Sequence, residues 1–223
     1  MVYSGHTINK MYYSGYTVSA AFSCGGYKVF GDEGCTKLTY TFCGSEQEEY
    51  TVTGNSSVLT SGDTNNQRLH PGTSETKYMK KAIIGDCITE IGNYAFSGET
   101  CLDTITLPSG LTKIGMNAFA EVCITGITFP STLRYIGGSA FGICRSLRTV
   151  NIPSGVTYIG YGAFDGCRSL TSITVNATTP PELRPEAFDN TNNCPIYVPS
   201  DSVNTYKAAS NWSGYASRIQ AIQ

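Results

Sequence analysis

The sequence predicts a β-solenoid, in which the chain winds into stacked coils and each coil adds short strands to shared sheets. The first observation is one motif of 22 to 23 residues written four times, at 88–110, 111–132, 133–155 and 156–178. The second is that each copy places an Ile-Gly pair ahead of an Ala-Phe pair. The third is an alternating apolar and polar segment in each copy. A fixed period in the twenties is the signature of stacked repeat units.

The first copy shows how one coil is expected to fold. Apolar and polar residues alternate in Leu102–Pro108, which predicts a short strand with one buried face. Pro108 ends this strand because proline cannot donate a ladder hydrogen bond. The next segment, Leu111–Ile114, is expected to bury its two ends and to expose Thr112 and Lys113. The later copies are expected to repeat both strands.

The Ala-Phe pair is expected to fill the interior of each coil. Gly115 permits a turn, and Asn117-Ala118-Phe119 is expected to begin a helical or 3₁₀ turn. The phenylalanines Phe96, Phe119, Phe141 and Phe164 recur at intervals of 23, 22 and 23 residues. Stacking is therefore expected to lay each Phe on the next and to bury what a single coil cannot.

Residues 1 to about 30 carry a weaker repeat of period 10, with turns at Gly5, Gly15 and Gly25. The alternating segments between these glycines predict short strands joined by tight hairpins. Such a small sheet needs a partner surface to be stable. The sequence leaves two roles open for it, attachment to an assembly and oligomerisation through residues 1–30.

Residues 31–87 are expected to join this region to the repeats. Strands are predicted at Lys37–Phe42 and Glu49–Thr53 around a polar turn. The acidic run Glu46, Glu48 and Glu49 is interpreted as a solvated hairpin tip, because no spaced Asp, Asn and Gly loop for calcium accompanies it. Residues 60–77 are interpreted as a linker or long loop. A strand at Lys81–Ile84 is expected to open the solenoid.

The last segment departs from the repeat as a cap should. An incomplete coil with Ala187-Phe188 and a strand at Pro195–Val198 precedes a helix from Val203 to about Ser210, with Asp201 or Ser202 as N-cap. Val203, Tyr206 and Trp212 are expected to close the core, and Ile219 and Ile222 to lie on a final strand. The predicted divisions are a β-rich region at 1–59, a linker at 60–77, the solenoid at 78–181 and a cap at 182–223.

Composition excludes several functions. With a net charge of −2 the sequence shows no basic surface for binding nucleic acid. It contains no run of 18 apolar residues, so no membrane span is predicted. Few charges with 15 tyrosines and 24 glycines favour an extracellular or virion-type β protein. The N-terminus MVYSGHTINK lacks the features of a secretory signal, so the sequence leaves open a removed signal and release by another route, such as lysis.

Cysteine and histidine usage argues against a metal or catalytic site. Five of the nine cysteines, Cys101, Cys123, Cys144, Cys167 and Cys194, follow the repeat and are expected to fill one equivalent buried position in the reduced state. Cys24, Cys35, Cys43 and Cys87 lie outside that register, and one disulfide among them is left open. Both histidines, His6 and His70, lie in turn-like segments. The prediction is no catalytic residues, no cofactor and no metal.

The segments IGNYAF, LPSGLTKIG, AFGICRSLRTVNIPSGVTYIG and AFDGCRSLTSITV resemble the BspA-like leucine-rich repeats of surface and secreted proteins from anaerobic bacteria. The ending from TTPPELRPEAF onward is also similar to the usual terminus of that family, so the resemblance covers about residues 80–223. It implies a curved, right-handed leucine-rich-repeat solenoid with short helical or 3₁₀ turns, used in adhesion and protein binding without catalysis. The repeats at YSGHTINKMYYSG resemble short β repeats of phage tail-associated proteins.

The leading functional expectation is a non-enzymatic module that binds a protein or glycan at the cell surface or outside the cell. One outward column of side chains is expected on the longer strands and includes Gly126, Thr128, Thr149, Asn151 and Thr174. A second precedes each Ile-Gly pair and includes Lys113, Arg134, Tyr135 and Tyr158. Tyr and Arg are enriched at binding hot spots, so the second column is favoured. The alternative is a structural or attachment component of a phage-derived assembly.

Overall fold

The computed structural model describes short strands between residues 7 and 84, and then every residue from 89 to 223. The first four strands are β1 (Thr7–Tyr13), β2 (Tyr16–Ser23), β3 (Gly26–Gly31) and β4 (Lys37–Phe42). They pair antiparallel in chain order. The hairpin strands predicted near the N-terminus are therefore confirmed.

Several predictions fall outside the described residues. These are the ones for His6, His70, Glu46, Glu48, Glu49, residues 60–77, Cys24, Cys35, Cys43 and Cys87.

The N-terminal strands continue directly into a sheet of the solenoid. Strand β7 (Met79–Ile84) pairs antiparallel with β4 and parallel with β9 (Thr104–Thr106). Strand β5 (Thr51–Val52) also pairs with β7, in parallel. The predicted hairpin between 37–42 and 49–53 is wrong, because β4 and β5 each pair with β7. The segment between β4 and β5 is longer than an ordinary hairpin loop. Both strands form their backbone pairs with β7.

The solenoid lays a second, parallel sheet of two-residue strands along its other side. Its order is β15-β13-β11-β10-β8-β6. The strands are β6 (Val58–Leu59), β8 (Glu90–Ile91), β10 (Lys113–Ile114), β11 (Tyr135–Ile136), β13 (Tyr158–Ile159) and β15 (Glu182–Leu183). Strand β6 comes from a residue range assigned by sequence to the N-terminal region, and it pairs with β8.

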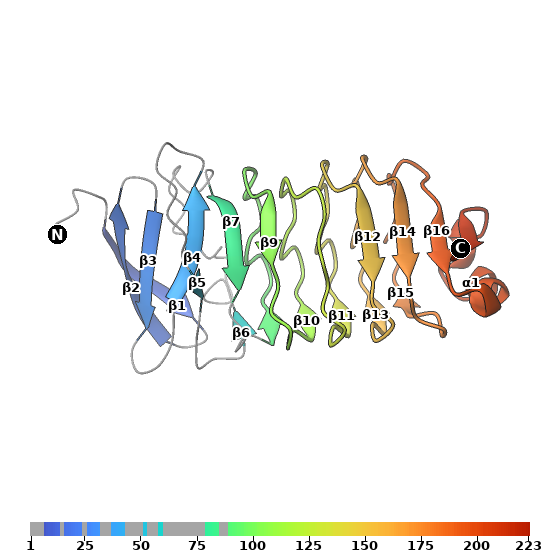
Figure 1. The fold of residues 1–223 in the computed structure, drawn as a ribbon, viewed down its shortest axis with the longest axis horizontal. Helices are drawn as coiled ribbons and strands as arrows, with labels where there is room; N and C mark the ends of the chain where they lie inside the picture. Colours follow the sequence, from blue (N-terminus) through green and yellow to red (C-terminus); the bar gives the residue numbers. More distant parts are fainter. Residues whose placement is uncertain are drawn as a thin grey trace.

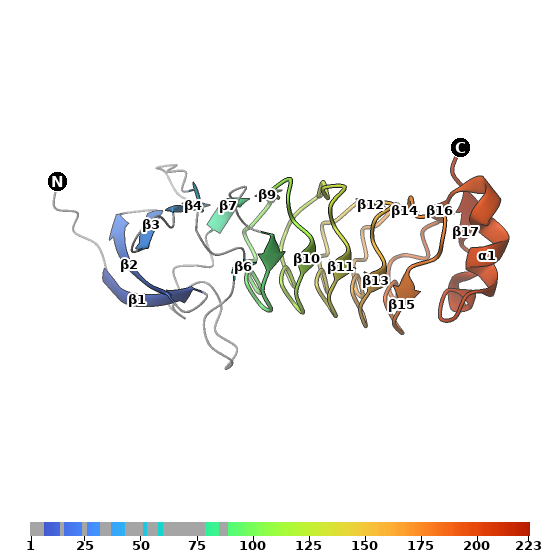
Figure 2. The same ribbon diagram turned by 90° about the horizontal axis from the view of Figure 1, so that it is seen from below.

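The longer strands toward the C-terminus form a third sheet. They are β12 (Thr149–Ile152), β14 (Ser172–Val175), β16 (Ile196–Val198) and β17 (Ile219–Ala221), paired in that order. Figure 1 shows the coils stacked along one axis, with β1 to β3 at one end and α1 at the other. In Figure 2, β10, β11, β13 and β15 lie on one side of the solenoid and β12, β14 and β16 on the other.

The second coil interrupts the sheet of longer strands. The segment Ile127–Phe129 was expected to be a strand, but this part of the coil forms a single bridge, from Gly126 to Thr149. This copy has one residue fewer than its neighbours between Phe119 and Ile124, the buried residue equivalent to Leu102 and Leu147. The bridge from Gly126 to Thr149 keeps the register of the repeat, but without a strand in this coil the sheet that contains β7 and β9 and the sheet that contains β12 and β14 stay separate.

The core is a continuous stack of phenylalanine rings. Consecutive ring centroids lie 5.2 to 5.8 Å apart with the planes within 18° of parallel. The members are Phe96, Phe119, Phe141, Phe164 and Phe188, all fully buried. The predicted stack is confirmed and extends one coil further, into the incomplete coil at Phe188.

The turn that carries each Phe is hydrogen-bonded, but its residues alternate between right-handed and left-handed backbone conformations. The i to i−3 bonds of a 3₁₀ turn are present, as from the Ala120 N–H to the Asn117 carbonyl at 3.2 Å. However, the residues two before and two after each Phe have positive φ, for example Asn117 at 53° and Glu121 at 64°. The alternation turns every second N–H toward the next coil. The N–H of Phe119 thus donates to the Ala140 carbonyl at 2.8 Å.

Close approach of the coils explains the glycine of each Ile-Gly pair. A Cβ built on Gly137 would lie 2.5 Å from the carbonyl carbon of Gly115, and one on Gly160 would lie 2.4 Å from the Gly138 nitrogen. Neither Gly137 nor Gly160 has a positive φ. These glycines are therefore required by space between coils and not by an unusual backbone conformation.

The C-terminal cap closes the core with two aromatic side chains. Trp212 and Tyr206 are fully buried, and the indole N–H donates to the Pro181 carbonyl at 2.8 Å while the Tyr206 hydroxyl donates to the Ala177 carbonyl at 2.8 Å. The prediction for these residues is confirmed, and Val203 packs against them partly buried.

Other details of the predicted cap are wrong. A 3₁₀ turn, η2 (Ser200–Ser202), leads into α1 (Val203–Ala208), so the helix ends two residues earlier than expected, and a second turn, η3 (Ser213–Tyr215), follows. Ser202 is the N-cap residue, as one of the two predicted candidates, but its hydroxyl makes no cap bond and instead donates to the Thr178 carbonyl at 2.7 Å. Ile222 lies beyond the last strand and is 39% exposed, because the sheet has no further coil to cover it.

Two of the repeat cysteines occupy equivalent buried positions. Cys144 and Cys167 each lie three residues after their Phe, and their thiols donate to the carbonyls of Phe119 and Phe141 at 3.1 and 3.0 Å. The hydrogen bond with the Cys167 thiol, together with burial, raises the pKa of the Cys144 thiol above its usual range. The Cys144 thiol is therefore held neutral as a core group.

The prediction that all five repeat cysteines share one buried position is wrong. Cys101 is partly buried and Cys123 is exposed, and each precedes the buried Leu102 or Ile124. Cys194 is buried in the position that leucine or isoleucine holds in earlier coils. A period counted on cysteine alone mixes three positions, because the cysteines lie at different distances after their Phe: three residues for Cys144 and Cys167, five for Cys101 and six for Cys194.

Candidate functional site

The predicted binding residues lie on two different sides of the solenoid. Lys113, Tyr135 and Tyr158 belong to the sheet of two-residue strands, whereas Thr149, Asn151 and Thr174 belong to the sheet of longer strands (Figure 2). Arg134 directly precedes β11. The structure therefore divides the candidates into two surfaces that a small ligand cannot contact together.

The sheet of short strands carries an outward row that we name the tyrosine column. Its members are Glu90, Lys113, Tyr135, Tyr158 and Glu182, which pair with one another in order through the parallel register. Each is followed in its strand by a buried Ile or Leu. Strand alternation thus directs this row outward while anchoring each coil by the next residue.

At the centre of the column, the rings of Tyr135 and Tyr158 stack face to face. Their centroids are 4.5 Å apart and their planes are parallel, at 0°. Both side chains are half-buried. Burial against neighbouring atoms, and then the nearby Tyr135, raise the pKa of the Tyr158 hydroxyl, so this hydroxyl is neutral at physiological pH.

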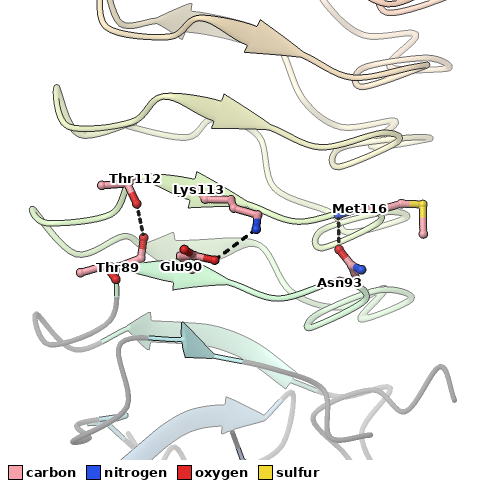
Figure 3. Close-up of polar contacts among 6 residues, drawn as sticks. All are labelled: Thr89, Glu90, Asn93, Thr112, Lys113 and Met116. Atoms are coloured by element: carbon pink, nitrogen blue, oxygen red, sulfur yellow. Dashed lines mark hydrogen bonds and ion pairs between the residues drawn. The ribbon is translucent and has the colours of Figure 1, made fainter. Parts of the chain in front are cut away.

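Charged pairs border the tyrosines on both sides. The Lys113 Nζ lies 3.2 Å from the Glu90 Oε2, as Figure 3 shows, and 5.9 Å from the centroid of the Tyr135 ring. On the other side, Arg184 Nη1 lies 3.7 Å from Glu182 Oε1. These side chains are well exposed, and each such pair contributes little to stability. Their arrangement gives an aromatic centre with a charged border.

The coils next to this column are also tied by polar contacts outside the strands. Figure 3 shows the Thr112 hydroxyl, which donates to the Thr89 carbonyl at 3.0 Å, and the Met116 N–H, which donates to the Asn93 side-chain oxygen at 2.8 Å. Similarly, the Thr157 hydroxyl donates to the Arg134 carbonyl at 3.3 Å. The column therefore rests on a backbone that is braced between neighbouring coils.

Arg134 is largely committed to its own coil. Its Nη1 donates to the carbonyls of Ser131 and Leu133 at 2.8 and 3.0 Å. A Cβ at Gly155 would lie only 2.0 Å from the same nitrogen, so the guanidinium packs directly over that glycine. Of the residues predicted for this surface, Arg134 is thus the one whose charged group braces the turn.

Three further apolar residues of the solenoid are exposed, of which the sequence pointed to Tyr161, as part of the Tyr- and Arg-rich C-terminal half, but not to Met116 or Ile143. Met116 is 43% exposed, Ile143 43% and Tyr161 52%. Met116 and Tyr161 directly follow the glycine of an Ile-Gly pair, where the coil between them has Gly138. A large apolar side chain directly after an Ile-Gly pair is the sequence signal that marks Met116 as exposed.

On the opposite side, Thr149 and Asn151 are exposed and Thr174 is half-buried. The Asn176 side-chain N–H donates to the Asn151 side-chain oxygen and to the Ile152 carbonyl. This surface is a polar ladder whose amide groups bind one another. Beyond Thr174 the row continues with Tyr197 on β16, a lone aromatic residue where the tyrosine column has a stacked pair.

Within the described part of the chain, no group of three His, Cys, Asp or Glu side chains is arranged to hold a metal ion. Over the same residues, no helix has the length and hydropathy of a membrane span.

Comparison with known proteins identifies the repeats. The family model described as "BspA type Leucine rich repeat region (6 copies)" matches residues 74–195. No curated protein matches the chain. Among solved structures, a leucine-rich repeat protein from Eubacterium ventriosum is 22% identical, with 72% of this chain and 39% of that chain covered and a TM-score of 0.50. At this identity the likeness shows the fold alone.

Two further structures are similar at lower TM-scores. The T. pallidum leucine-rich repeat protein TpLRR is 24% identical, with 72% of this chain and 78% of that chain covered and a TM-score of 0.48. The pneumococcal vaccine antigen PcpA is 15% identical, with 90% and 66% covered and a TM-score of 0.45. The family model matches more than half of the residues of this chain, so the chain belongs to the BspA-type leucine-rich repeat family.

Proposed function

We propose that this protein is a non-enzymatic binding module that recognises a protein partner through the tyrosine column. The observation that carries the proposal is the parallel stack of Tyr135 and Tyr158, half-buried in an otherwise short and polar sheet. A preordered aromatic pair loses little conformational entropy on binding, and Tyr is enriched at hot spots. The charged pairs at either side would supply the polar border typical of such interfaces.

The ring geometry favours a protein over a glycan. A sugar stacks on an open aromatic face, but here each tyrosine covers one face of the other, and Lys113 lies over the Tyr135 ring. What these contacts leave uncovered is one face of Tyr158, the ring edges and the two hydroxyls, each of which donates and accepts hydrogen bonds. Backbone and side-chain groups of a protein surface match this pattern well.

The proposed setting is the cell surface or the extracellular space. Few charged residues and many Tyr and Gly residues support it, together with membership in a family whose resemblance implied adhesion and protein binding. Oligomerisation through residues 1–30 and attachment to a phage-derived assembly remain sequence-based expectations. Oligomer mass, measured beside the binding experiment below, tests them.

The test replaces the aromatic pair without removing the ladder. In the double variant Tyr135→Glu with Tyr158→Lys, charges would alternate along the column from Glu90 to Glu182, so neighbouring coils stay complementary. The matched control is Thr149→Glu with Ser172→Lys, which creates the same charge pair between adjacent coils on the opposite side. Both variants and the wild type are screened against host proteins and a glycan array.

The expected result is that a protein partner binds wild type and control but binds the tyrosine variant at least about tenfold more weakly. Equal loss in both variants would mean that charge or stability, and not the tyrosines, controls binding. Binding of glycans only, or unchanged protein binding in the tyrosine variant, would contradict the proposal.

A further inference from the structure

The backbone hydrogen-bond ladder of the Phe turns has a defined direction. The residue two after each Phe is left-handed, and its N–H donates to a carbonyl of the following coil. The Glu121 N–H thus bonds to the Gly142 carbonyl at 2.8 Å, and the Gly166 N–H to the Asp189 carbonyl at 3.2 Å. The N–H groups of this ladder therefore always point toward the C-terminal end.

The cap completes this ladder at one position only. The Phe188 N–H donates to the Tyr215 hydroxyl at 3.3 Å, so a side-chain oxygen replaces the carbonyl of a missing coil. Asn190 has the same left-handed backbone, with φ 52°. Within residues 89–223, however, its N–H has no acceptor that continues the ladder.

A pocket lies where the next coil would be. Its volume is about 680 Å³, and it is lined by Phe188, Asp189, Asn190, Asn193, Gly214, Tyr215, Ser217 and Arg218. The Asn190 side chain is turned to the preceding coil, where its Nδ2 donates to Asp165 Oδ1 at 2.8 Å. The backbone N–H is thus left as the group that the pocket can use. Pockets of this size hold small ligands.

The two charged side chains of the pocket, Asp189 and Arg218, disfavour the binding of either an anion or a cation. Asp189 Oδ1 accepts the Tyr215 hydroxyl proton at 2.6 Å, and the carboxylate keeps further acceptor capacity. Arg218 is bound to the carbonyls of Cys194 and Phe188 at 2.8 and 3.1 Å. An anion would meet the Asp189 carboxylate, and a cation would meet the guanidinium of Arg218. A neutral group that both accepts and donates fits best.

We propose that this pocket binds a neutral amide, as in the backbone of a peptide. The amide carbonyl would accept from the Asn190 N–H and the amide N–H would donate to Asp189. A peptide bound this way continues the interrupted ladder of the coils, much as an added strand continues a sheet. The site is separate from the tyrosine column, which lies on the sheet of short strands.

The experiment titrates full-length, ¹⁵N-labelled protein with acetyl-glycyl-glycinamide and, separately, with acetate. The expected result is saturable shifts of the Asn190 and Gly214 amide resonances with the peptide amide and weaker binding of acetate. In Gly214→Trp, whose new side chain starts in open space, the pocket is filled and the affinity falls about tenfold or more. Gly126→Trp is the matched control, because Gly126 is equally open, and it should bind as wild type does.

A second variant tests the selectivity. Asp189→Asn retains an oxygen acceptor for the Tyr215 hydroxyl but removes the charge, so acetate binding should strengthen relative to the peptide amide by about fivefold or more. Failure of the peptide amide to shift the Asn190 resonance overturns the proposal. Acetate binding that is tighter than amide binding in wild type would also overturn it. Peptide binding that survives Gly214→Trp would do the same.

Discussion

Two stacks of aromatic rings run along this solenoid, one inside and one outside. The inner stack has five phenylalanines with centroids 5.2 to 5.8 Å apart. The outer one is the single pair Tyr135 and Tyr158 at 4.5 Å. The repeat spacing of the coils produces both, because equivalent positions in neighbouring coils lie side by side.

The comparison teaches that equal geometry does not mean equal energetic roles. Each inner ring is removed from water on all sides, so stacking adds to the full hydrophobic contribution of a Phe. Each outer ring keeps an edge and a hydroxyl in solvent. The inner stack therefore stabilises the coils, whereas the outer pair is placed where another molecule can contact it.

The largest effect is expected from the inner stack. Phe141→Ala should lower the free energy of unfolding by about 3–5 kcal/mol, because it leaves a cavity between two neighbouring rings. Urea denaturation followed by circular dichroism measures this. Tyr158→Ala serves as the outer counterpart and should cost about 1 kcal/mol or less. Similar losses in the two variants would remove the distinction between the stacks.

The next effect concerns the spacing that both stacks require. Gly137→Ala should destabilise the protein by about 1–3 kcal/mol, because its Cβ would lie 2.5 Å from Gly115 backbone atoms and force the coils apart. The control Gly126→Ala adds a Cβ that meets nothing within 4 Å and should change stability by about 0.5 kcal/mol or less. Thermal melts of both variants compare them. A neutral Gly137→Ala would show that the coils can separate freely.

A smaller effect is expected from the contact between the outer rings. In a double-mutant cycle of Tyr135→Leu and Tyr158→Leu, the coupling energy should be about 0.5 kcal/mol, the lower end for aromatic pairs, since both rings are half-exposed. Unfolding free energies of the four proteins provide it. A coupling above that expected for buried pairs would place the outer stack in the same class as the inner one.

The smallest effect should appear at alkaline pH. Burial and the neighbouring Tyr135 raise the pKa of Tyr158 in the folded state above the ordinary value of 10.0. Its contribution to stability is therefore complete below pH 10 and is lost as the pH rises through the folded pKa. Wild type should thus lose stability relative to Tyr158→Phe between pH 9 and pH 11, as measured by urea midpoints. A constant difference across that range would contradict the raised pKa.

The sequence was sufficient for the parts of the fold that repeat. Periodic Phe and Ile-Gly positions predicted the inner stack, the two strands of each coil and the capping role of Tyr206 and Trp212. Such a register is rarely kept by chance over four copies, because each equivalent residue has to fill the same buried position in its own coil. The prediction failed at Ile127–Phe129, which form no strand, and where cysteines of different positions were counted together.

The candidate site was predicted only in part, because exposure depends on neighbours that are distant in sequence. Lys113, Tyr135 and Tyr158 were correctly placed together in one outward column. Arg134 was expected to face a partner, but it bonds to carbonyls of its own turn. Met116 and Ile143 became candidates only once their exposure was known.

By itself, the sequence determined that the coils stack and which side chains fill them, since a repeated pattern encodes the same short-range fold in each copy. Only the tertiary structure decided that β7 joins the N-terminal strands to the solenoid in one sheet and that the tyrosine column and Thr149 lie on different sides. It also decided that Asn190 lines a pocket at the last coil and that its N–H has no acceptor among residues 89–223. The physical reason is that these features depend on contacts between different coils and on the ends of the stack, where the repeat no longer specifies the neighbour.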